Sequence, residues 1–312
     1  MLYLTYCFYS KVRSGSFKKT NYFQTMSGFV IKVLLPLALA FIMFGMGLTL
    51  TISDFKRVIS LPKATAIGLI NQLILLPLFG LLVVTIFPLS PTLTVGVLLL
   101  TFCPGGTTSN MISYLAKADV ALSVTLTAIS SMATVITIPL FLGMAIKRYM
   151  GAQQDINVAK IVLPVLVIAI VPVVIGMVIK ARSASTAKAI EKILAPFSVV
   201  FFIFIVVVAI YNDRANFFTH LKQAALPVLV INIVMMAFGF FSARLFKVNL
   251  RQSFTISLET GLQNGTLAIT IATTILSNTE MSIPGAVYGL LMFFTVVPVI
   301  IFARKALINP AN

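Results

Sequence analysis

Long apolar runs constrain the fold of this chain more than any other feature of its sequence. About 20 consecutive apolar residues cross the hydrocarbon core of a bilayer as a helix, and runs of that length recur almost from end to end. Nine such spans can be placed, at residues 29–50, 63–87, 92–116, 119–147, 157–180, 189–211, 222–244, 251–278 and 282–303. A membrane β-barrel needs short segments in which apolar and polar residues alternate, and these runs show no such alternation. The sequence therefore predicts an all-α polytopic membrane protein with about nine transmembrane helices.

Composition and charge agree with that class. Only 10% of the residues are charged and the mean hydropathy is +1.07, whereas soluble domains are about 25% charged. The net charge of +16 would suggest nucleic acid in a soluble protein, but here the basic residues lie in the loops, where they set topology. Their excess on one side predicts a cytoplasmic C-terminus and an external N-terminus in the cell (plasma or inner) membrane. We expect membrane lipid, and no nucleic acid, as a partner.

Residues 1–28 form a basic, polar tail before the first span. No apolar h-region follows its charges, so it is not a signal peptide. Two interpretations stay open: translation starts at Met26, or a short tail crosses the membrane.

Helix-breaking residues interrupt two of the spans. The first carries "FCPGGTTSN" at 102–110 and the second "ETGLQNG" at 259–265. Each broken span is the last but one of its block, where 29–148 holds four spans and 157–305 holds five. Aligning the breaks pairs spans that run in opposite directions, which predicts an inverted repeat of five plus five helices with the first one missing. Interrupted spans at matching positions indicate a transporter binding site.

Glu259 is the only acid that falls well inside an apolar run. A charge there costs roughly 2.5–3.5 kcal/mol on the insertion scale, so it requires a partner or a wet cavity. Three interpretations are open: a carboxyl near the membrane face, a proton carrier, or a cation ligand.

Uncharged polar residues beside the two breaks, in the span after the first break and in the interior of the second span favour the cation ligand. They are Asn71, Gln72, Ser109, Asn110, Ser123, Thr127, Thr260, Gln263 and Asn264. Neither a second acid nor a His lies well inside a span, whereas proton relays usually use chains of titratable groups. Each hydroxyl alone would more often bond its own helix, but their joint placement resembles a shell for Na⁺, to which an unwound helix also offers carbonyls.

Three motifs, "FIMFGMGLTL", "CPGGTTSNMISYLAKADVALSVTLTAIS" and "ETGLQNGTLAI", resemble in order and spacing those of the bile acid:sodium symporter family. The resemblance covers roughly residues 40–305. It implies a core domain with two broken helices that cross near mid-membrane, and a panel domain beside it. It also implies a secondary active transporter that imports an organic anion with Na⁺ by alternating access.

The resemblance also implies site residues and two coupling Na⁺ ions. The first sodium site would comprise Ser109, Asn110, Ser123, Thr127 and Glu259. The second would comprise Gln72, Glu259, Gln263 and backbone carbonyls of Thr260 and Leu262. The substrate anion would lie near Thr107, Thr108, Asn264 and Gly265, where half-helix N-termini present N–H groups.

Several alternatives stay open. The substrate could be a bile salt, a steroid conjugate or a small carboxylate such as pantoate, and Met292 and Phe293 make the pocket wall more apolar than a bile-salt site would suggest. An arsenite-type carrier would use Cys103 with Glu259, and a proton-coupled carrier or a non-transporting receptor are further rivals. An enzyme is not expected, because the spans hold no nucleophile–base pair and His220 stands alone in a loop.

Overall fold

A computed structural model describes residues 35–49, 51, 59–151, 158–194 and 216–308, with single positions at 197, 200 and 207. Within these ranges every regular element is helical. The helices are α3 (Leu35–Thr49), α5 (Pro62–Ile70), η2 (Asn71–Leu75), α6 (Leu76–Ile86), α7 (Pro91–Phe102), α8 (Thr107–Leu115), α9 (Val120–Tyr149), α10 (Val158–Arg182), α12 (Phe217–Leu245), α13 (Leu250–Gly261), α14 (Gly265–Thr270), η3 (Ile271–Ile275), η4 (Glu280–Ser282) and α15 (Ile283–Ile308).

The all-helical prediction is confirmed for the described residues. Four continuous helical stretches there are long and apolar enough to cross a membrane: Pro62–Ile86, Val120–Tyr149, Phe218–Leu245 and Glu280–Leu307. The predicted span at 189–211 lies mostly outside the described residues, and the tail at 1–28 lies entirely outside them. The count of nine helices, the inverted repeat and the two domains therefore stay predictions.

The two broken spans meet at their breaks. Pro104 has no backbone N–H and disfavours helical geometry in the residue before it, and Cys103 is indeed extended, with ψ 152°. In the other span, the helix ends at Gly261 and restarts at Gly265. Between these helix ends, the N–H of Asn264 donates to the carbonyl of Pro104 over 2.9 Å, and Gly105 pairs with Gln263 in an isolated antiparallel bridge. The two extended segments thus provide hydrogen-bond partners for some of each other's backbone groups inside the helical core.

A π-helical turn interrupts the α5–α6 span at Asn71–Leu75. Pro77 lies in the first turn of α6, where its missing N–H and its ring prevent regular α-helical bonding to the preceding turn. The side chains of Asn71 and Gln72 bond in different directions from this turn: Asn71 donates to Ser242 on α12, whereas Gln72 donates to Gln263 at the second break.

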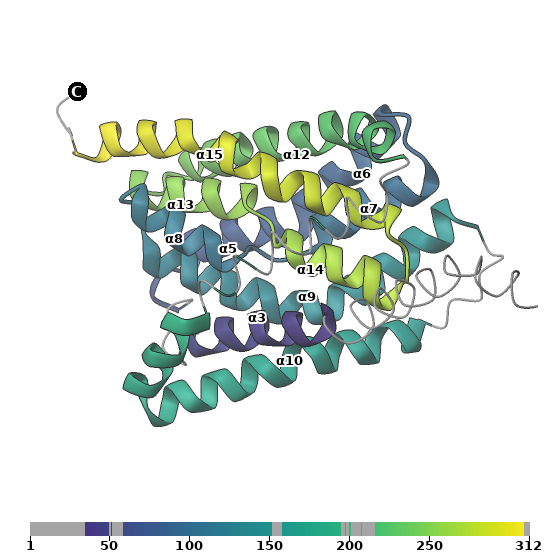
Figure 1. The fold of residues 1–312 in the computed structure, drawn as a ribbon. Helices are drawn as coiled ribbons and strands as arrows, with labels where there is room; N and C mark the ends of the chain where they lie inside the picture. The colour runs from purple at the N-terminus through teal and green to yellow at the C-terminus, as the bar shows by residue number, and fades with distance from the viewer. Residues whose placement is uncertain are drawn as a thin grey trace, which may run out of the picture.

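α3 and α10 lie side by side along the lower edge of the molecule in Figure 1. Their backbones approach closely, because a Cβ on Gly47 would collide with the backbone of Val173 and one on Gly176 with that of Phe44. Small residues permit such close helix packing in membranes. α12 and α15 run along the opposite edge, with the two breaks between these pairs (Figure 1).

Candidate functional site

The carboxylate of Glu259 lies in the protein interior with three hydroxyl groups around it. Its side chain belongs to α13, and the residue is 1% exposed. Ser109 donates to its Oε2 over 2.7 Å, Ser123 to Oε2 over 3.0 Å, and Thr127 to Oε1 over 2.5 Å. The first sodium site inferred from the sequence is therefore one contiguous cluster in space, completed by Asn110.

Two local features of the chain position the polar residues of the cluster. Ser109 and Asn110 lie in the first turns of α8, directly after the first break. Ser123 and Thr127 are one helical turn apart on α9 and so share a face, and Asp119 caps that helix by accepting from Leu122 N–H over 3.1 Å. Hence the break and the α9 cap together set which hydroxyls reach Glu259.

The cluster holds more acceptors than protons. Besides Glu259, Ser109 Oγ faces the carbonyl of Gly106 at 2.7 Å. Ser123 Oγ likewise lies 2.8 Å from Asn110 Oδ1, and Thr127 Oγ1 lies 3.4 Å from the same atom. A hydroxyl donates one proton, so each of the three has two acceptors for a single proton. The arrangement is rich in oxygen and poor in hydrogen.

Neutral groups alone surround the carboxylate within the described part of the chain: no Lys, Arg or His there forms an ion pair with Glu259. Gly105 leaves the room for it, because a Cβ at that position would collide with Glu259 Oε1. A buried carboxylate without a cationic partner is costly. Oxygen ligands of this kind suit hard cations.

The residues of the second inferred sodium site form a separate network. Gln72 Nε2 donates to Gln263 Oε1 over 2.7 Å and to the carbonyl of Cys103 over 3.1 Å. Gln263 Nε2 donates to the carbonyl of Thr260 over 2.8 Å, and Leu262 is buried beside it. Glu259 shares no hydrogen bond with this network among the described residues, so the structure brings these groups into one region without joining the carboxylate to the glutamines.

The inferred substrate residues divide into two groups. Asn264 is largely buried, and its Oδ1 accepts from Leu267 N–H over 3.0 Å, so it caps α14. Gly265 packs closely against the backbone of Gly285, where a Cβ would collide. Thr107 and Thr108 begin α8, whose N-cap, Gly106, offers no side-chain cap. The side chain of Thr108 is half-buried, and that of Thr107 lies outside the described residues.

Comparison with known proteins identifies the family. Residues 36–220 match the profile of the Sodium Bile acid symporter family. The chain belongs to this family. Because the family consists of membrane-embedded transporters, the expectation that this protein is not an enzyme is confirmed, and so is the resemblance seen in the sequence motifs.

Relatives of the chain carry related names. A probable chloroplastic sodium/metabolite cotransporter of Arabidopsis thaliana is 30% identical over 245 residues, which are 78% of this chain and 60% of that protein. An uncharacterized sodium-dependent transporter of Bacillus subtilis is 31% identical over 252 residues, 80% of this chain and 77% of that protein. The ileal sodium/bile acid cotransporter of Oryctolagus cuniculus is 30% identical over 255 residues, 80% of this chain and 72% of that protein. The chain thus spans 60% of the length of the Arabidopsis relative.

Two residues that sequence reasoning missed hold the second break. Asn232 Nδ2 on α12 and Tyr288 OH on α15 both donate to the carbonyl of Gly261, over 2.7 and 2.8 Å. That carbonyl ends α13, where no helical partner follows it. Both side chains are buried. The available signal was an Asn and a Tyr within apolar spans, the same signal that singled out Gln72.

Cys103 does not resemble a ligand. Its thiol is buried and donates weakly to the carbonyl of Leu99 in its own helix over 3.3 Å. Only its backbone carbonyl reaches the second network, through Gln72. A buried Cys behaves as a small hydrophobe, and the described residues contain no group of three His, Cys, Asp or Glu that could hold a metal.

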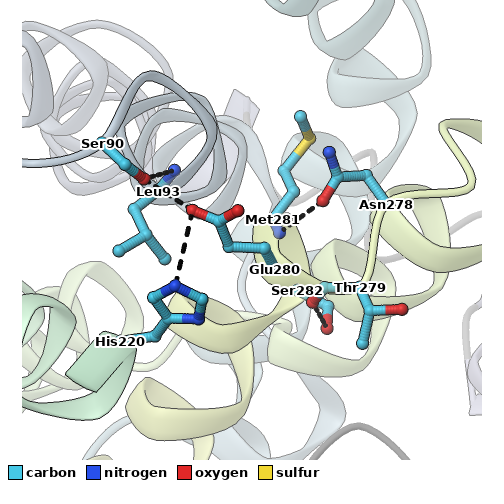
Figure 2. Close-up of polar contacts among 8 residues, drawn as sticks. All are labelled: Ser90, Leu93, His220, Asn278, Thr279, Glu280, Met281 and Ser282. Atoms are coloured by element: carbon cyan, nitrogen blue, oxygen red, sulfur yellow. Dashed lines mark hydrogen bonds and ion pairs between the residues drawn. The ribbon is translucent and has the colours of Figure 1, made fainter. Parts of the chain in front are cut away.

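A second carboxylate lies at one end of the helices and contrasts with Glu259. Glu280 Oε1 accepts from Ser90 Oγ over 2.6 Å and lies 3.9 Å from His220 Nε2 (Figure 2). The sequence-based placement of His220 alone in a loop is wrong. It lies in the first turn of α12, and its imidazole faces Glu280 (Figure 2).

Proposed function

We propose that this protein is a secondary active transporter that couples inward Na⁺ movement to the uptake of an organic anion by alternating access. The observation that carries the proposal is the cluster around Glu259, where the buried carboxylate accepts from three hydroxyls that each have two acceptors for a single proton, and where no Lys, Arg or His among the described residues forms an ion pair with it. A cation entering this cluster would meet oxygens only. The names of the relatives, which include sodium/metabolite and sodium/bile acid cotransporters, support Na⁺ as that cation.

The first ion would be held by Ser109, Asn110, Ser123, Thr127 and Glu259. The second would be held by the oxygens of Gln72 and Gln263 with the carbonyls of Thr260 and Leu262. Glu259 would be shared by both, which requires the glutamine pair to exchange its mutual hydrogen bond for the ion and to approach the carboxylate. Binding of the second ion would therefore rearrange the side chains of Gln72 and Gln263 at the second break, next to the residues proposed to bind the substrate.

The substrate would bind at the crossing of the broken helices. The N-terminus of α8 is the better anion partner, because Gly106 leaves the first N–H groups of Thr107 and Thr108 without a side-chain cap. Asn264 already occupies part of the N-terminus of α14. A single carboxylate or sulfate would satisfy the α8 terminus, so we propose a monoanion, of the bile-salt, steroid-conjugate or small-carboxylate class.

Transport would follow from motion of a core domain against a panel domain. The closely packed pair α3 and α10 is the candidate for part of the panel, because its two helices contact each other far more extensively than they contact the broken spans. The core would contain both breaks and α9. In this scheme 29–148 and 157–305 are the two inverted repeats, with the C-terminus in the cytoplasm of a cell-membrane protein.

Uptake into proteoliposomes tests the proposal. Protein reconstituted with an inward Na⁺ gradient should accumulate a labelled organic anion, and an equal K⁺ gradient should not support accumulation. A prior thermal-shift screen of organic anions in Na⁺ and K⁺ buffers would choose the substrate. Accumulation driven by a proton gradient with Na⁺ absent would favour the proton-coupled alternative, and ligand binding without any accumulation would favour a receptor.

The stoichiometry has its own test. Two Na⁺ ions with one monoanion carry a net positive charge inward, and one charge is worth about 2.3 kcal/mol per 100 mV of membrane potential. An inside-negative potential, set with valinomycin and K⁺ gradients, should therefore accelerate uptake. Uptake of a monoanion that ignores the potential would exclude two sodium ions per cycle.

A further inference from the structure

A groove runs along the outer surface between the α5–η2 stretch and the C-terminal half of α12. Its volume is about 820 Å³, within the range of about 300–1,000 Å³ that is typical of sites for small molecules. Apolar side chains make most of its wall, among them Ile70, Leu75, Phe238 and Phe241. It lies on a different face of the π-helical turn from Gln72, so it is separate from the site described above.

Exposed apolar side chains alone do not distinguish this surface, since outward faces throughout the molecule carry them. This groove is concave and has a basic end. Arg244, in the last turn of α12, lines it, and Lys247 follows that helix directly. Lys63 lies in the first turn of α5 at the same end, because its neighbour Ala64 packs in one cluster with Ala243 and Val248.

A polar bridge joins the two walls beneath the apolar surface. Asn71 Nδ2 donates to Ser242 Oγ over 2.8 Å, and Asn71 is 1% exposed. The π-helical turn places Asn71 there, and such turns occur frequently at functional sites. The bridge holds the walls at a set distance, so the groove exists before any occupant arrives.

Arg244 is positioned to bind an anion at the groove's end. Its Nη1 donates to the carbonyl of Val248 over 2.7 Å, which uses one of the five N–H donors of a guanidinium and orients the rest of the group. The residue itself is exposed. Arginine in this setting binds phosphate oxygens by paired hydrogen bonds.

We propose that this groove binds one anionic phospholipid, with an acyl chain along the Ile, Leu and Phe wall and the phosphate at Arg244 and Lys247. Apolar length, a single basic end and a location in a membrane-embedded family together match that amphiphile. A second copy of this chain fits less well, because a two-fold contact through this face would bring two basic ends together.

Native mass spectrometry of the purified full chain tests the proposal, with phosphatidylglycerol and phosphatidylcholine of identical acyl chains as probes. We expect one retained phosphatidylglycerol per protein and about tenfold weaker retention of phosphatidylcholine. Ile70→Trp fills the groove and Arg244→Gln removes its charge, so both should lose the lipid. Ile136→Trp, at an exposed position on α9, and Lys147→Gln, in the last turn of α9, are the matched controls and should keep it.

Loss in both groove variants with retention in both controls supports the proposal. Equal retention of the two lipids, or phosphatidylglycerol surviving in Ile70→Trp, overturns it. Loss in Arg244→Gln alone also overturns it, because the headgroup would then bind without the groove. A dimer that Ile70→Trp dissociates would assign the groove to a second copy. If Arg244→Gln fails to fold, Ile70→Trp and its control decide alone, since that change removes no hydrogen bond.

Discussion

Glu259 and Glu280 are both carboxylates that accept a hydrogen bond from a serine, yet their surroundings differ in every other respect. Glu259 is 1% exposed and meets three hydroxyls and no cationic side chain within the described residues. The side chain of Glu280 is 30% exposed and lies beside an imidazole at the end of the helices (Figure 2). The contrast is between a buried carboxylate that forms no ion pair within the described residues and a partly exposed carboxylate beside a His, and only the first is the one that we propose as a cation ligand.

Replacing Glu259 should produce the largest effect. Glu259→Gln keeps the shape but removes the charge and adds an amide donor to a cluster of acceptors. Sodium-dependent thermal stabilisation and Na⁺-driven uptake should both be lost, while expression and membrane insertion persist. The measurement is the melting temperature across a Na⁺ titration, followed by uptake. Sodium dependence retained at the wild-type level would contradict the assignment of Glu259 as a Na⁺ ligand.

Gly105→Ala should come next. The added methyl group would collide with Glu259 Oε1, and over-packing of this kind costs about 1–3 kcal/mol. We expect the Na⁺ concentration for half-maximal stabilisation to rise. Gly106→Ala is the matched control, because a Cβ there would approach other atoms no closer than 3.9 Å. Similar Na⁺ titrations for the two variants would show that the carboxylate does not occupy the position described here.

Removing one hydroxyl should have an intermediate effect. Ser123→Ala and Thr127→Ala each delete a hydroxyl oxygen that we propose as a neutral Na⁺ ligand, which should cost about 1–3 kcal/mol, or roughly 5- to 150-fold in Na⁺ affinity. The readout is the half-saturating Na⁺ concentration in uptake and in thermal shift. Thr125→Ala controls for cavity and helix effects, since Thr125 lies buried on the same helix and bonds the carbonyl of Ala121. An unchanged Na⁺ dependence in both variants would move the site elsewhere.

Glu280→Gln should have the smallest effect. Partly exposed ion pairs contribute about 0–1 kcal/mol, so the melting temperature should fall by a few degrees at most. The half-saturating Na⁺ concentration should not change. A shift in that concentration as large as the one for Ser123→Ala would mean that Glu280 takes part in the coupling of Na⁺ to transport. The two carboxylates would then not differ in function.

Local sequence patterns determined most of the helical architecture that the structure describes. Apolar runs located the helices to within a few residues, because the need to satisfy every backbone group in lipid leaves little alternative to helices. Pro104 and the surrounding glycines located the first break for equally local reasons. Glu259 was conspicuous because a lone acid in an apolar run has an energetic cost that demands an explanation. The roles assigned to the ligands stay proposals.

Only the tertiary structure decided which side chains contact each other at the breaks. Glu259 and Ser109 are 150 residues apart, and Tyr288 reaches the carbonyl of Gly261 from another helix. The separation of the glutamine network from the carboxylate and the capping of α14 by Asn264 were likewise not visible in the sequence. The physical reason is that a break frees backbone groups whose replacement partners come from packed neighbours. Which neighbours arrive depends on helix packing at close range, and no single stretch of sequence encodes that packing.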